Sequence, residues 1–74
     1  MKIVIEGAGE VGSHLAKMLR SEGNEVTVID ADQQRISALS SYSDVEAIVG
    51  NPTSIQTLKD AGVGRADLFI AVYP

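Results

Sequence analysis

Residues Lys2 to Gly12, with the sequence KIVIEGAGEVG, decide the fold of this chain. An apolar, β-branched run at Ile3–Ile5 leads into Gly7-Ala8-Gly9, and Gly12 follows three residues later. A strand, a tight glycine turn and a helix start in this order are typical of the first unit of a dinucleotide-binding sheet. The stretch therefore predicts a parallel strand whose end carries a phosphate-binding turn.

The alternation of apolar runs and helical patterns continues to the end of the chain. We expect strands at Lys2–Ile5, Glu25–Ile29, Val45–Val49 and Leu68–Val72. We expect helices from Glu10 to Ser21, from Asp32 or Gln33 to Ser40, and from a cap at Thr53 or Ser54 onward, with a loop at Ser41–Asp44. Right-handed crossovers then give a parallel sheet in strand order 3-2-1-4. Residues 1–74 are predicted to form a partial dinucleotide-binding domain of the α/β, Rossmann-like class (β-α-β-α-β-α-β), which is half of a doubly wound domain.

The first expected helix, Glu10–Ser21, contains two kinds of packing residue. Its larger apolar residues repeat at helical spacing, and we expect them to form one apolar face: Val11, Leu15, Met18 and Leu19. Gly12 and Ala16 are small on the side that must approach the sheet. His14, the one histidine of the chain, falls away from the apolar face and is expected on the surface.

Composition excludes several classes of function. The net charge of −4 argues against a nucleic-acid partner, because such proteins need clustered Lys and Arg to displace counterions. No apolar run approaches the roughly 20 residues that a membrane span requires, so we expect no direct membrane insertion. The chain has no cysteine, which excludes disulfides and thiolate metal sites and fits a reducing cytoplasm. Neither a catalytic constellation nor a metal cluster can be recognised.

The glycine turn provides the first group of candidate ligand contacts. At a helix N-terminus, free backbone N–H groups and the macrodipole both favour an anion such as a phosphate. Gly7 permits the tight turn, Gly9 lets the backbone approach a pyrophosphate, and Gly12 allows close packing of helix and strand. The alternative is that these glycines serve packing alone. The candidate contacts from this segment are Gly7, Ala8, Gly9, Glu10, Val11 and Gly12.

Asp30 ends the second expected strand, 18 residues after Gly12. A carboxylate at this point can accept hydrogen bonds from both ribose hydroxyls of an adenosine, and it repels a 2′-phosphate, so NAD is favoured over NADP. The alternative is that Asp30 only caps the next helix, although Asp32 is the better candidate for that cap. Ala31 joins the candidate site, as does Arg35, which either reaches a phosphate or is a solvated charge.

Two other strand ends are expected at the same edge of the sheet, at the rim of the ligand-binding crevice that this edge would form. Gly50-Asn51 follows the third strand and either contacts the adenine edge or only forms a turn and helix entry. Ala71-Val72 ends the fourth strand beside the switch point, where open parallel sheets bind their ligands. Glu6 and Glu10 add negative charge near the glycine turn, which disfavours a triphosphate and favours a dinucleotide.

Four stretches of the sequence carry a more specific similarity than the glycine turn alone: MKIVIEGAGEVGSHLAKML, VTVIDADQQRI, VGNPTSIQTLKDAGV and ADLFIAV. Together they resemble the N-terminal domain of TrkA-type potassium-uptake regulators, also known as regulator-of-potassium-conductance (RCK or KTN) domains. The resemblance implies a non-enzymatic cytoplasmic domain that binds NAD(H) or adenine nucleotides and transmits occupancy to a membrane potassium transporter. Family domains are longer, with further strands, and assemble as dimers and rings, so the chain is expected to be their first half.

Carried over by position, the resemblance assigns roles to the candidate residues. It implies a phosphate turn at Gly7, Gly9 and Gly12, a ribose acceptor at Asp30, an adenine side at Gly50 and Asn51, and phosphate flanks at Ala71 and Val72. Some triphosphate-binding relatives have Arg where Glu10 stands, so NAD or NADH is the expected cofactor, and ATP or AMP is less expected. The expected location is the inner face of the membrane, reached through a transporter subunit.

The leading hypothesis is an NAD/NADH-sensing, non-catalytic regulatory module of a potassium-uptake system. The alternative is the cofactor-binding half of an NAD-dependent oxidoreductase, and a third is a structural half-domain that binds nothing. The fourth strand, Leu68–Val72, is an uncharged edge that can pair with another chain. We therefore expect a homo-oligomer, formed by pairing at this strand or by exchange of elements between copies.

Overall fold

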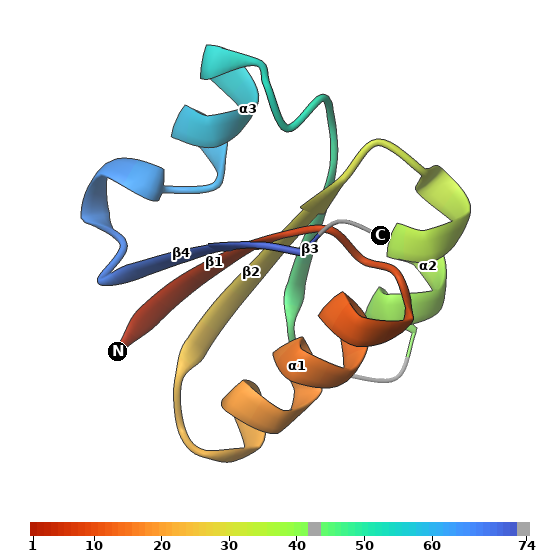
Figure 1. Ribbon diagram of the computed structural model, residues 1–74, viewed down its shortest axis with the longest axis vertical. Helices are drawn as coiled ribbons and strands as arrows, with labels where there is room; N and C mark the ends of the chain where they lie inside the picture. Colours follow the sequence, from red (N-terminus) through yellow and green to blue (C-terminus); the bar gives the residue numbers. More distant parts are fainter. Residues whose placement is uncertain (42–43, 73–74) are drawn as a thin grey trace.

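The computed structural model describes residues 1–41 and 44–72, which form a four-stranded parallel sheet with helices on both faces (Figure 1). The strands are β1 (Lys2–Glu6), β2 (Glu25–Asp30), β3 (Glu46–Val49) and β4 (Leu68–Ala71). The helices are α1 (Glu10–Ser21), α2 (Gln33–Ser40) and α3 (Ile55–Asp60), and a 3-10 turn, η1 (Val63–Arg65), precedes β4. The order β3-β2-β1-β4 confirms the predicted Rossmann-like α/β fold. The loop predicted at Ser41–Asp44 lies partly outside the described residues.

Strand β1 is covered on both faces, because successive residues of a strand point to opposite sides of the sheet. On one side, Ile5 belongs to a buried cluster with Ala16 of α1 and Leu39 of α2. On the other side, Val4 belongs to a smaller cluster with Ala61, which directly follows α3. Figure 1 shows the same division, with α1 and α2 on one face and α3 on the other. The continuous apolar run of β1 therefore reflects burial from both sides, as predicted.

Helix α1 packs on the sheet through the small residues that were predicted to approach it, but only part of its apolar face is buried. Gly12 and Ala16 are its buried residues, whereas Val11 and Met18 are 67% and 45% exposed. The apolar face expected from periodicity is therefore buried only in part, because Val11 and Met18 lie outside the contact with the sheet. The physical reason is that the two small residues allow the closest approach to the sheet, so the contact line runs through them, and the leucines of the helix are partly buried beside it. His14 is exposed, as predicted.

Side-chain caps determine where two of the helices begin. Asp32 caps α2, because its Oδ1 accepts hydrogen bonds from the N–H groups of Gln34 (2.9 Å) and Arg35 (3.4 Å). This confirms the predicted cap. Ser54, one of the two predicted candidates, caps α3 by accepting a hydrogen bond from an N–H in its first turn. Helix α1 differs, because its N-cap residue is Gly9 and no side chain caps it.

Candidate functional site

The turn between β1 and α1 depends on two glycines. Gly7 has a φ of +119°, which favours glycine, and a Cβ there would collide with the carbonyl oxygen of Val72. A Cβ at Gly12 would collide with the carbonyl oxygen of Gly7, so the helix approaches the turn closely only because that atom is missing. The hydroxyl of Ser13 donates to the carbonyl oxygen of Ala8 at 2.9 Å and holds the turn against the helix. Gly7 and Gly12 are therefore needed for the shape of the turn itself.

The first turn of α1 leaves backbone donors available. Within the described residues, the N–H groups of Gly9, Glu10, Val11 and Gly12 have no hydrogen-bond partner, and the N–H of Ser13 is the first to bond, to the Gly9 carbonyl at 2.9 Å. A Cβ built at Gly9 meets nothing within 4 Å, so the space beside these donors is open. Free N–H groups and the helix dipole together favour an anion at this point.

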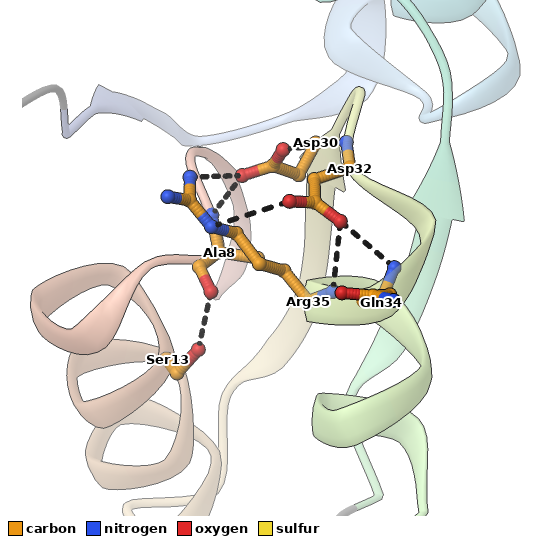
Figure 2. A network of polar contacts seen from close by, with 6 residues as sticks. All are labelled: Ala8, Ser13, Asp30, Asp32, Gln34 and Arg35. Atoms are coloured by element: carbon orange, nitrogen blue, oxygen red, sulfur yellow. Dashed lines mark hydrogen bonds and ion pairs between the residues drawn. The ribbon is translucent and has the colours of Figure 1, made fainter.

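Asp30, at the C-terminal end of β2, links this turn to α2 (Figure 2). Its Oδ2 accepts a hydrogen bond from the N–H of Ala8, and its Oδ1 accepts one from the N–H of Asp32, both at 2.8 Å. Burial raises the pKa of the Asp30 carboxyl, but these two donors and the charge of Arg35 outweigh it, so the pKa lies below its ordinary value. A carboxylate has about four acceptor positions, so Asp30 is a charged acceptor that retains capacity for further donors.

Arg35 lies in the first turn of α2 and reaches back across the site. Its Nη1 is 3.7 Å from Asp30 Oδ2, and its Nε is 3.8 Å from Asp32 Oδ2. Figure 2 shows the guanidinium directed toward the β1–α1 turn, near Ala8. Its side chain is 53% exposed, whereas that of Asp30 is 12% exposed. The corner of the site next to α2 therefore combines one cation with two carboxylates.

These groups line one open cleft of about 410 Å³, within the range of about 300–1,000 Å³ that is typical of ligand pockets. Most of the predicted contacts line it: Gly7, Gly9, Glu10, Val11, Gly12, Asp30, Ala31, Arg35 and Val72. Ile29 and Pro52 also line it and were missed. Each directly adjoins a predicted residue in the sequence, but an apolar side chain or a proline carries no chemical signal of a binding site.

Four predicted contacts do not line the cleft: Ala8, Gly50, Asn51 and Ala71. The N–H of Gly50 donates to the Asp30 carbonyl at 3.1 Å, and a Cβ on Gly50 would lie 2.8 Å from the Thr57 side chain. The Oδ1 of Asn51 accepts hydrogen bonds from the N–H (2.9 Å) and the hydroxyl (2.7 Å) of Thr53. Both residues thus form the turn into α3, which is the alternative that the sequence left open.

The cleft offers two kinds of polar group to a ligand. Backbone donors at the start of α1 suit a phosphate, and the Asp30 carboxylate suits hydroxyl groups. Within residues 1–41 and 44–72, His, Cys, Asp and Glu side chains form no group of three or more that could hold a metal ion. In the same part of the chain, no helix is long and apolar enough to cross a bilayer.

Comparison with known proteins identifies relatives along almost the whole chain. The family model of the TrkA-N domain matches residues 3–74. The Trk system potassium uptake protein TrkA of Haemophilus influenzae is 43% identical over 72 residues, and the TrkA homolog of Archaeoglobus fulgidus is 50% identical over 72 residues. Both alignments cover 97% of this chain but 16% of the relative. The TrkA homolog of Pyrococcus abyssi is 38% identical, with 97% and 32% covered. The chain thus spans a third or less of the length of these relatives.

Proposed function

Because this chain belongs to the TrkA-N domain family, we propose that it is a nucleotide-sensing regulatory module of a potassium-uptake system. TrkA-N domains are Rossmann-like nucleotide-binding domains. The names of the relatives, Trk system potassium uptake proteins, support the potassium-uptake role. Since the chain covers only part of each relative, the proposal concerns ligand recognition here and signalling in the longer protein.

We propose NAD or NADH as the ligand. The observation that carries this proposal is that one cleft holds both the free N–H groups at the start of α1 and the Asp30 carboxylate. The pyrophosphate would lie beside Gly9, and the adenosine ribose would donate both hydroxyls to Asp30. Glu10 also lines the cleft, and its carboxylate disfavours the larger charge of ATP.

We propose that ligand binding is signalled by a change in conformation and not by a chemical reaction. Asp30 contacts both the β1–α1 turn and the N-terminus of α2, so a ligand bound to it touches two elements at once. A ligand shifts a conformational equilibrium only through its different affinities for the two states. We propose that this shift is read by a membrane potassium-transporter subunit on the cytoplasmic side. The alternative, half of an NAD-dependent oxidoreductase, has less support because the relatives are named as transport-system proteins.

Isothermal titration with NAD, NADH, NADP, AMP and ATP tests the ligand. We expect NAD or NADH to bind most tightly, and Asp30→Asn to weaken that binding at least about tenfold, equivalent to about 1.4 kcal/mol. Asp60→Asn, which removes an exposed carboxylate of α3 outside the cleft, is the matched control and should bind as the wild type. Tighter binding of NADP than of NAD, or unchanged NAD affinity in a folded Asp30→Asn chain, would contradict the proposal.

A further inference from the structure

Arg35 is held in the cleft by charge and not by directed hydrogen bonds. Its distances to Asp30 and Asp32, 3.7 and 3.8 Å, both exceed the 2.7–3.2 Å range of an N–H···O hydrogen bond. The side chain is half-exposed, lines the cleft and points toward the β1–α1 turn (Figure 2). A guanidinium in this situation is free to move to a more highly charged anion, because it has no short bond to break.

Two carboxylates offset the single positive charge of Arg35. Asp30 is fixed by the N–H groups of Ala8 and Asp32, so its charge stays beside the guanidinium. Asp32 uses Oδ1 to cap α2 and leaves Oδ2 toward Arg35. The corner therefore carries a net negative charge at the place where Asp30 would hold the ribose hydroxyls. A 2′-hydroxyl fits this corner, whereas a 2′-phosphate is repelled although a guanidinium lies within reach.

We propose that Arg35 is the residue that can select for a phosphate at the 2′ position of the nucleotide. The carboxylates of Asp30 and Asp32 mask Arg35, which means that they offset its positive charge. The inference rests on the proposed nucleotide function. While both carboxylates are present, the diol of NAD is preferred. When one carboxylate is removed, the guanidinium is released to pair with the 2′-phosphate of NADP, for which its planar fork is well suited.

Asp32→Asn is the variant that isolates this effect. Asparagine is as good an N-cap as aspartate, so α2 keeps its start, and the ribose acceptor Asp30 is untouched. We expect the Kd for NADP to fall about three- to tenfold, because one partly exposed negative charge is removed near the phosphate. The Kd for NAD should change by a smaller factor, because Asp30 still holds the ribose diol. Raising the salt concentration should reduce the gain for NADP.

Two double variants decide whether Arg35 is responsible. In Asp32→Asn/Arg35→Gln the gain for NADP should disappear, whereas in Asp32→Asn/Arg65→Gln it should persist, because Arg65 of η1 lies outside the cleft. If the gain persists without Arg35, or if Asp32→Asn alone gives no gain while NAD binds normally, the masking of Arg35 is refuted and the nucleotide function stands. If neither dinucleotide binds the wild type or the variants, the nucleotide function itself is wrong, and the inference falls with it.

Discussion

Alanine at Gly9 tests whether the open side of the β1–α1 turn serves a ligand. Gly9 has φ −70° and ψ −166°, which alanine adopts without strain, and its Cβ would meet nothing within 4 Å. Alanine is a poorer N-cap than glycine, but it also reduces the entropy of the unfolded chain by about 0.4–1 kcal/mol, so the two effects nearly cancel. The free energy of unfolding should therefore change by less than about 1 kcal/mol. The new methyl group would occupy the approach to the N–H donors, and the affinity for NAD should fall at least about tenfold.

Alanine at Gly12 is the matched substitution with the opposite outcome. Its Cβ would collide with the Gly7 carbonyl oxygen, a backbone atom that cannot rotate away. Overpacking of this kind costs about 1–3 kcal/mol, and the need to move backbone places this case at the upper end or beyond. Each kcal/mol lowers the Tm of a domain of this size by about 4–8 °C. At about 3 kcal/mol, we expect Gly12→Ala to lower the Tm by about 12 °C or more.

Thermal unfolding followed by circular dichroism, together with titration of NAD, separates the two effects. Because the free energy of unfolding should change by less than about 1 kcal/mol, Gly9→Ala should unfold within about 8 °C of the wild type, and it should bind NAD weakly. Gly12→Ala should lose stability first, whatever its affinity. Wild-type affinity in Gly9→Ala would refute the idea that a pyrophosphate approaches the turn here. Wild-type stability in Gly12→Ala would show that the close approach of helix and turn is not required.

Two further predictions concern charge and assembly. Because the pKa of Asp30 is lowered in the folded chain, its contribution to stability is fully present at neutral pH and is lost as the pH falls below about 4. Urea unfolding should therefore show that the wild type is more stable than Asp30→Asn at neutral pH and that this difference shrinks below about pH 4. A constant difference down to about pH 2 would contradict this. In the described sheet, β4 is an edge strand that pairs with β1 alone, and its Leu68 and Phe69 are 44% and 40% exposed. Sedimentation should therefore show species heavier than the 7.8 kDa monomer, and Phe69→Lys should return them to the monomer. A wild type that is monomeric at all concentrations would oppose this.

The sequence predicted the elements of this fold because its signals are local. Apolar runs mark the strands, and caps such as Asp32 mark helix starts. Gly12 and Ala16 were correctly expected on the side of α1 that approaches the sheet, but periodicity shows only which residues are apolar and not which of them the contact buries, so the exposure of Val11 and Met18 was not predicted. Val11 and Gly12 differ by roughly 100° around the helix, and the smaller residue sets the contact line. Turn η1 was missed because three residues carry no period, although Gly62 before it has a φ of +79°.

The cleft was predictable where the chemistry of a residue and the topology of the sheet agree. Parallel strands bring their carboxyl ends to one edge, and this alone places Gly7, Asp30 and Val72 beside one another. Asn51 shows the limit of such reasoning. Its amide can serve a ligand or a turn equally well, and only the bonds from Thr53 show that its oxygen is used for the turn.

Asp30 has a role in the fold as well as in the candidate site, and its position in the sequence could not show this. As a ribose acceptor it needs only to stand at the end of β2, yet its Oδ2 also holds the N–H of Ala8 inside the phosphate turn. A substitution at Asp30 therefore disturbs the phosphate end of the cleft as well as the ribose end. A loss of NAD affinity in an Asp30 variant would therefore reflect both the lost ribose contact and the changed shape of the turn. In the described part of the chain, the side chains of Asp32 and Arg35 contact α2, Asp30 and each other and are not bonded to that turn, so they are the positions at which ligand recognition can be separated from the shape of the turn.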